Sequence, residues 1–247
     1  MIFEKLKRYL FALRNSQKYE NIICLGYNCE IAYRFYKKYK FIDSSLFGWT
    51  YVTFNQLKFA LENFELIGNG DFEYDMPSHT IKCLNTGIFF HGRTSASEFT
   101  NNEEENEKII NEDKIELKSR IKYLKDKFIK YTNNGKSTLY IRKVDLNNMR
   151  LTDDCEQKRK EVIWIYNYLK SFCKNKFKLL IVVEKPFYDK FVFDNSAIIT
   201  RYVEKYSPDS CVTAKNEGDK YGWNLIFTEF QPKNRKKQKG KLKFEVN

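Results

Sequence analysis

The sequence has few of the features that mark disordered, secreted or membrane-spanning proteins. Its 247 residues include only four Pro and ten Gly, too few for a disordered chain. No apolar stretch approaches the roughly 20 residues of a membrane span, and the apolar run 9–13 is too short for a signal peptide. The six cysteines form neither a CxxC pair nor a short Cys/His cluster, so no metal site is expected. We therefore predict a folded cytoplasmic protein with reduced thiols, which at most associates with a membrane peripherally.

A net charge of +12 is concentrated at the two ends of the sequence. Residues 1–14 carry four basic residues and one acidic residue, and residues 233–243 carry seven Lys or Arg and no acid. We expect 232–247 to be a disordered basic tail. Basic ends attract phosphates or anionic lipid without specificity. Because no recognition module accompanies this charge, we expect no specific nucleic-acid partner.

The segment 1–19 has the pattern of an amphipathic helix. Phe3, Leu6, Leu10 and Leu13 recur at helical spacing among Lys and Arg residues. Such a helix either docks on the folded body or lies on an anionic membrane surface.

Residues 20–231 alternate between strand and helix patterns, which predicts one α/β domain with a mixed, mostly parallel sheet flanked by helices. The segment 177–183 is apolar except for one Lys, as is typical of a central strand covered on both faces. Asn85-Thr86-Gly87 predicts a hairpin turn, and Thr53 with Gln56 matches the capping box that begins a helix. The expected strands are 22–25, 81–84, 88–91, 139–142, 177–183 and 224–230; the expected helices are 29–39, 54–64, 113–131 and one that begins at 152, with a polar surface excursion over 93–112.

Cys29 is the residue most suggestive of chemistry. It follows a short buried strand and a tight turn, and Asn28 is the expected N-cap of the next helix. A thiol in the first turn of a helix faces unpaired N–H groups and the positive end of the helix dipole, which favour the thiolate. The same N–H groups can stabilise an oxyanion formed by thiolate attack on a carbonyl. The alternative is a small buried residue that closes the start of a helix.

A thiolate nucleophile benefits from a nearby imidazole, and the sequence contains two histidines. His91 ends an apolar strand, whereas His79 lies in a loop, so we expect His91 to be the base. A third group should orient the imidazole. We select Glu184, just past the apolar strand, with Asp145 and Asp43 as alternatives.

Four short segments occur in a distinctive order: CLGYNCE at 24–30, SSLFGW at 44–49, GIFFH at 87–91 and LYIR at 139–142. A basic helix over 118–130 and a late Trp223 accompany them. In order and spacing they resemble the SLG-x-x-C-E, S-x-P-F-D-W, G-x-x-F-x-H and hydrophobic-F-hydrophobic-R motifs of a bacterial family described as papain-like cysteine peptidases. The resemblance spans most of 20–230.

The resemblance implies a papain-like α/β core with Cys29 as nucleophile and His91 as base. Two positions depart from the family pattern, because Gly48 stands where the family usually has Asp, and Gly92 stands where an Asp often follows the histidine. If either Asp orients the imidazole in relatives, this chain uses another group or is less active. We take Asn28, Trp49 and Arg142 as the candidate substrate-binding residues.

These observations predict acyl transfer through a thioester on Cys29, with His91 moving the proton. The substrate would be a small molecule, a peptide or a glycan. As a hydrolase the protein would be of the papain-like cysteine peptidase type and would need no cofactor. One alternative is a coenzyme A-dependent acyltransferase of capsule or surface polysaccharide biosynthesis, since related papain-like proteins occur there. Another is a non-catalytic binding module that retains the fold.

Overall fold

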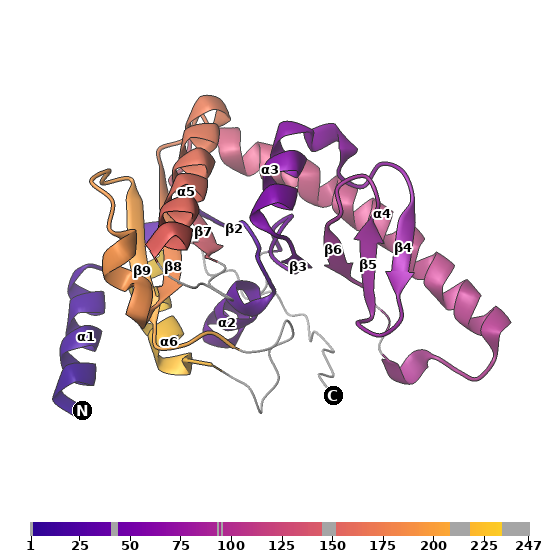
Figure 1. Ribbon diagram of the computed structural model, residues 1–247, viewed down its shortest axis with the longest axis horizontal. Coiled ribbons are helices and arrows are strands. Elements are labelled where there is room, and N and C mark those ends of the chain that lie inside the picture. Colours follow the sequence, from indigo (N-terminus) through magenta and orange to yellow (C-terminus); the bar gives the residue numbers. More distant parts are fainter. Residues whose placement is uncertain are drawn as a thin grey trace.

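A parallel sheet of four strands forms the centre of the structure, a computed structural model that describes residues 2–40, 44–92, 94, 96–144, 152–207 and 218–233. The strands lie in the order β2 (Asn21–Cys24), β7 (Thr138–Lys143), β8 (Phe177–Glu184) and β9 (Ile198–Val203), and all three pairings are parallel (Figure 1). The predicted central strand is confirmed as β8, whose residues 179–183 are fully buried between two neighbours. Helices cover both faces of the sheet, so a strand in its middle is buried on both sides and its sequence is an almost continuous apolar run.

Helices flank the sheet as expected. In Figure 1, α5 (Thr152–Phe172) lies above the sheet, while α2 (Glu30–Tyr39) and α6 (Lys220–Glu229) lie below it. Phe35 of α2 meets Phe227 of α6 edge to face, with ring centroids 5.5 Å apart. On the other side Tyr166 of α5 packs on Phe177. The core therefore consists of a sheet between two helical layers.

A second, antiparallel sheet stands beside the first, in the order β3 (Thr50–Tyr51), β6 (Phe89–His91), β5 (Thr80–Cys83) and β4 (Phe72–Asp75). The predicted hairpin is confirmed: β5 and β6 pair, and Gly87 takes a φ of +67° in the turn. The capping box is also confirmed, since Thr53 Oγ1 accepts from the Gln56 N–H and begins α3 (Phe54–Glu62). The long helix α4 (Glu103–Asn133) runs behind this sheet in Figure 1.

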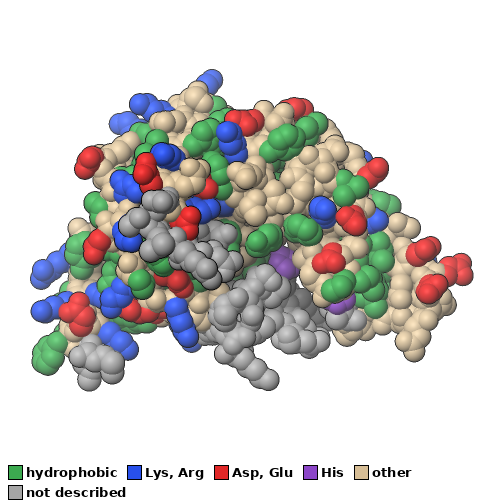
Figure 2. Space-filling model, viewed as in Figure 1, with side chains coloured by type: hydrophobic (Ala, Val, Ile, Leu, Met, Phe, Trp, Pro, Cys, Tyr) green, Lys and Arg blue, Asp and Glu red, His purple; other side chains and the backbone are tan. Residues whose placement is uncertain are grey.

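The two ends of the described chain meet. After α1 (Ile2–Arg14), strand β1 (Gln17–Tyr19) pairs in parallel with β10 (Phe230–Pro232). Helix α1 packs on α6 at one side of the molecule (Figure 1), where hydrophobic and basic side chains share the surface (Figure 2). The predicted N-terminal helix is confirmed, although it ends at Arg14 and the rest of 1–19 joins the strand pairing.

Three structural predictions need correction. The parallel and antiparallel strands form separate sheets rather than one mixed sheet. The segment 224–230 is not a strand: helix α6 covers it up to Glu229, and it is buried on nearly every side, which removes the polar positions that would have revealed a helical period. The excursion over 93–112 is wrong beyond 102, because α4 begins at Glu103.

The early start of α4 has a local cause. Asn102 Oδ1 accepts from the N–H groups of Glu104 and Glu105, and three Glu residues in the first turn complement the helix dipole. The polar composition of this segment therefore belongs to an exposed helix end.

Within the described residues, no helix is both long and apolar enough to cross a membrane. The predicted basic tail beyond Lys233, and the alternative carboxylates Asp43 and Asp145, lie outside the described residues.

Candidate active site

The carboxyl edge of the parallel sheet gathers several of the residues selected from the sequence. The segment that follows β2 carries Cys29, β7 ends at Lys143, and β8 ends at Glu184. In open parallel sheets, ligands bind at this edge because the chain leaves the strands there and the loops provide functional groups. The candidate residues therefore lie at the edge of the sheet from which the loops leave, although the strand order does not reverse within it.

The turn between β2 and α2 positions Cys29 under strict backbone constraints. Gly26 and Tyr27 both take positive φ angles, +78° and +91°. A Cβ on Gly26 would overlap the Val52 side chain, so the turn needs glycine there. The Tyr27 backbone is in a region that non-glycine residues rarely adopt, and its carbonyl accepts from the Val52 N–H at 3.1 Å. The turn is thus fastened to β3.

Cys29 is the N-cap residue of α2, one position earlier in the helix than predicted. Its carbonyl accepts from the Tyr33 N–H at 2.9 Å, and its side chain makes no capping hydrogen bond. Asn28, the predicted N-cap, lies just outside the helix, yet its Oδ1 still accepts from the Glu30 N–H at 3.2 Å. The thiol therefore remains at the positive end of the helix dipole, as the sequence suggested.

A buried ion pair beside Cys29 was not predicted. Lys143 Nζ lies 2.7 Å from Glu30 Oε2, and the two side chains are 1% and 0% exposed. Lys143 Nζ also donates to Asn28 Oδ1 at 3.4 Å. The other carboxylate oxygen of Glu30 accepts from Trp223 Nε1 at 2.9 Å and from the Ser207 N–H at 3.1 Å. The residues on either side of Cys29 are thus fixed by one lysine.

The electrostatics of this cluster connect it to the thiol. Burial lowers the pKa of Lys143, and the negative charges of Glu30, Cys29 and Glu184 offset only part of this lowering. The ammonium group also lies over the Tyr206 and Tyr27 rings, at 4.1 and 5.2 Å from their centroids. A cation in this position favours the thiolate form of Cys29.

Glu184 belongs to the lysine cluster. Its Oε1 accepts from the Tyr206 N–H at 2.7 Å, and its charge acts on Lys143. Burial, with Glu184 and Glu30 nearby, raises the pKa of Tyr206 well above its ordinary value. The structure thus brings Glu184 to the Cys29 side of the site and gives it no described hydrogen bond to His91.

His91 lies at the end of β6, half-buried. Its carbonyl accepts from Arg120 Nη2 at 2.5 Å, and its N–H donates to the Trp49 carbonyl at 3.5 Å. Among the described residues, no side chain forms a hydrogen bond with the imidazole. Burial, and secondarily the Arg120 charge, lower the pKa of His91 below 6.5. The ring is therefore neutral near pH 7, the form that a general base requires.

Strand β3 connects the Cys29 turn to the His91 strand. Tyr51 pairs with Phe89, and the Tyr51 ring lies 6.4 Å from the Phe89 ring and 5.8 Å from the Tyr27 ring. Side chains alternate along a strand, so His91 is on the same face of β6 as Phe89. The His91 side chain is thus on the face of the sheet where Tyr51 contacts Tyr27. Tyr27 precedes Cys29 by two residues in the sequence.

Arg142 strengthens the same connection. Its Nη1 donates to the Leu25 carbonyl at 2.6 Å and its Nη2 to the Val52 carbonyl at 3.1 Å, with the side chain almost fully buried. Its described hydrogen bonds therefore clamp the Cys29 turn to the chain after β3. Its suggested role in binding substrate stays a prediction.

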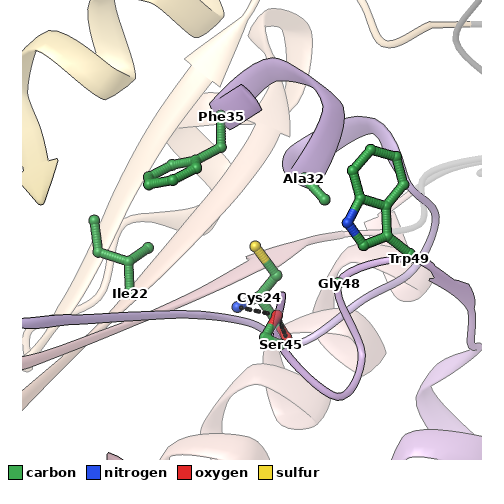
Figure 3. A pocket seen from close by; sticks show the side chains of 7 residues that line it. All are labelled: Ile22, Cys24, Ala32, Phe35, Ser45, Gly48 and Trp49. Carbon is green, nitrogen blue, oxygen red and sulfur yellow. Dashed lines mark hydrogen bonds between the residues drawn. The ribbon is translucent and has the colours of Figure 1, made fainter. Parts of the chain in front are cut away.

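Trp49 lines a small pocket with Ile22, Cys24, Ala32, Phe35, Ser45 and Gly48 (Figure 3). The Cys24 sulfur points into this pocket, and its backbone N–H donates to Ser45 Oγ at 3.2 Å. Neither Cys29 nor His91 is among the described residues that line it. Substrate contact by Trp49 thus stays a prediction, and the pocket is beside Cys24.

The departures at Gly48 and Gly92 have local structural causes. A Cβ at Gly48 would come within 2.7 Å of Ser45 Oγ, and a Cβ at Gly92 would overlap Asp113 Oδ2. Asp113 is buried on α4 and accepts from the Thr94 N–H at 3.3 Å. A carboxylate therefore occupies the space beside position 92, supplied by another element.

The second histidine lies in a different environment. His79 Nδ1 is 3.4 Å from the Tyr74 hydroxyl, and its ring packs on Tyr74 and Phe99. These residues are on the β4–β5 side of the antiparallel sheet. The aromatic packing gives His79 a structural role.

No family model, no curated protein and no solved structure matches this chain. In the described part of the chain, no group of three or more His, Cys, Asp or Glu side chains could hold a metal ion. The function must therefore be inferred from the residues at the carboxyl edge of the sheet.

Proposed function

We propose that this protein is a papain-like cysteine enzyme that transfers an acyl group through a thioester on Cys29. The observation that carries this proposal is the position of Cys29 at the N-cap of α2, beside the buried Lys143–Glu30 pair. The helix dipole and the lysine charge both favour the thiolate. The N–H groups at the start of α2 are candidate donors to an oxyanion.

His91 acts as the base in this proposal. It takes the thiol proton, and the sulfur attacks the carbonyl carbon of the acyl donor. The C–S bond then forms as the bond to the leaving group breaks, and the imidazolium returns the proton to that leaving group. The lowered pKa of His91 supports this role, as does its position on the Tyr51 face of β6.

The acyl acceptor decides the reaction type. Water as acceptor gives a hydrolase of the peptidase type, while a sugar hydroxyl gives the coenzyme A-dependent acyltransferase proposed as the alternative. Both reactions use the same Cys29 thioester. We keep the proposal that Glu184 orients the imidazole. Its described contacts are with the cluster around Cys29, where it accepts from the Tyr206 N–H and its negative charge favours the protonated form of Lys143.

A binding module without catalysis is the second candidate. Two observations make it worth testing: Cys29 is only 5% exposed, and the His91 ring has no hydrogen-bond partner among the described side chains. Catalytic hydrogen bonds are often formed only once substrate is bound, so these observations agree with either candidate.

Intact-mass spectrometry separates the two candidates. The protein is incubated with a panel of activated acyl esters and, in parallel, with acyl-coenzyme A thioesters. The proposal predicts one acyl adduct, located on Cys29, released by hydroxylamine and absent from Cys29→Ser. Cys24→Ser is the matched control and should acylate like the parent, because Cys24 lies in the same segment with similar burial. Absence of any adduct, or equal adducts on several cysteines, would favour the binding module.

A further inference from the structure

Helix α1 exposes an apolar stripe that the folded body does not cover. The side chains of Phe3, Leu6, Leu10 and Leu13 are 81%, 51%, 41% and 43% exposed. Their spacing places them on one face, because successive residues of an α-helix turn by about 100°. The stripe is too regular to be a set of unrelated surface residues.

The opposite face of α1 holds the helix on the body. Ala12 is 2% exposed, and the Arg8 guanidinium lies 4.4 Å from the Tyr202 ring and 3.1 Å from Glu204 Oε1. The Tyr221 hydroxyl donates to the Lys5 carbonyl at 2.5 Å. Arg8 and Ala12 are one turn apart, and on a helical wheel they are roughly opposite Leu6 and Leu10. The docking thus turns the apolar stripe away from the protein.

Basic residues accompany the stripe. Lys7 and Arg14 lie along one edge of it on the wheel, the half-exposed Tyr9 lies along the other edge, and α1 contains a single acid, Glu4. The strand pair β1–β10 places Lys233 beside Tyr19, five residues after α1 ends, and the Lys233 N–H donates to the Tyr19 carbonyl at 2.7 Å. From Lys233 the sequence continues with the basic stretch to Lys243. Figure 1 places α1 at the lower left, and on that part of the surface Figure 2 shows Lys or Arg side chains and hydrophobic side chains with acidic ones among them.

We propose that α1 is a membrane-docking helix that inserts its Phe3–Leu6–Leu10–Leu13 face into the interface of an anionic lipid surface. An apolar face with Lys and Arg along one edge matches such a surface in both respects: the apolar side chains enter the acyl boundary, and the cations meet the anionic headgroups. A second copy of the chain would match the apolar face but would repel the basic border. The proposal does not depend on the chemistry of Cys29.

Vesicle co-sedimentation tests this surface. The full chain should bind vesicles of phosphatidylcholine mixed with phosphatidylserine, and it should bind pure phosphatidylcholine much less. The double substitution Leu6→Gln/Leu10→Gln should weaken binding to the mixed vesicles roughly tenfold or more, because it removes two leucines from the inserted face. Gln is a good helix former, so α1 should persist, which circular dichroism checks.

The matched control is Ile115→Gln/Ile129→Gln, which removes two aliphatic residues, 69% and 49% exposed, from helix α4. This control should bind like the parent. A second variant, Lys7→Gln/Arg14→Gln, should lose most of the preference for phosphatidylserine while α1 stays folded.

Three results would overturn the proposal. The first is a parent chain that does not sediment with the mixed vesicles. The second is equal binding by the Leu6→Gln/Leu10→Gln variant. The third is a dimer in light scattering that this variant abolishes, which would identify a second copy of the chain as the occupant of the stripe.

Discussion

Replacing Lys143 by Met tests the buried ion pair on which the candidate site rests. The substitution keeps the length of the side chain but removes the charge that faces Glu30 at 2.7 Å. Both side chains are at most 1% exposed, so the Glu30 carboxylate would be left charged and without its cation inside the protein. Breaking such a pair from one side costs about 3–5 kcal/mol of unfolding free energy.

That loss corresponds to a measurable drop in melting temperature. At this chain length, each kcal/mol lowers the midpoint by about 2–4 °C, so Lys143→Met should melt about 6–20 °C lower. Typical domains have a stability of about 5–15 kcal/mol, so the variant should still fold at room temperature. Urea unfolding followed by tryptophan fluorescence measures the free energy.

A double variant identifies the cause. In Lys143→Met/Glu30→Gln neither member of the pair is charged, and the Gln carbonyl can still accept from Trp223 Nε1 and the Ser207 N–H. The double variant should therefore recover at least half of the stability that Lys143→Met loses. The reasoning is refuted if Lys143→Met costs less than about 1 kcal/mol, or if the losses of the two single variants add.

Further predictions concern the base and the elements that hold the site. Because burial lowers the pKa of His91, the unfolded chain binds a proton near pH 6.5 more readily than the folded one. Stability should therefore fall as the pH drops below 6.5, and His91→Gln should flatten this dependence in urea titrations; an unchanged slope would contradict it. In the proposed enzyme, the rate should rise with pH as His91 loses its proton, and the midpoint of this rise should lie below pH 6.5 in a pH–rate profile. Arg142→Met should cost roughly 2–4 kcal/mol in urea unfolding, because two buried carbonyls lose a charged donor; a cost below 1 kcal/mol would argue against the clamp. Gly92→Ala should lower stability by roughly 1–3 kcal/mol, since the new methyl group overlaps Asp113, and a neutral effect would mean that Asp113 moves freely. Thr53→Ala should cost about 1 kcal/mol through the lost cap, with Asn55→Ala, an exposed position on the same helix, as control.

The sequence predicted those elements whose signals are local. The capping box at Thr53 and the turn at Gly87 each depend on a few neighbouring residues, and both are present. The buried strand 177–183 was recognisable because its apolar run leaves no solvent-facing position. Helix α6 was mistaken for a strand for the same reason: Leu225, Ile226 and Phe227 are all buried, so no period is visible.

The candidate site was predictable only in part. Cys29 and His91 could be selected because each lies at the end of an element. Lys143 could not, since a lysine at a strand end is usually solvated, and its burial depends on Glu30, which is 113 residues away in the sequence. The separation into two sheets depends on strand pairing over long distances, which periodicity does not encode.

The pH dependence of alkylation at single cysteines is the most direct test of the central claim, that Cys29 is held as a reactive thiolate. Iodoacetamide at limiting concentration is added across a pH series, and mass spectrometry measures the alkylation rates of Cys29 and Cys24. The two side chains are similarly buried, Cys24 being 7% exposed and Cys29 5%. The account predicts that Cys29 reacts faster, that its rate rises at a lower pH than that of Cys24, and that Lys143→Met shifts this rise upward for Cys29 alone. A Cys29 that reacts no faster than Cys24, with the same pH midpoint in the parent and in Lys143→Met, would contradict it.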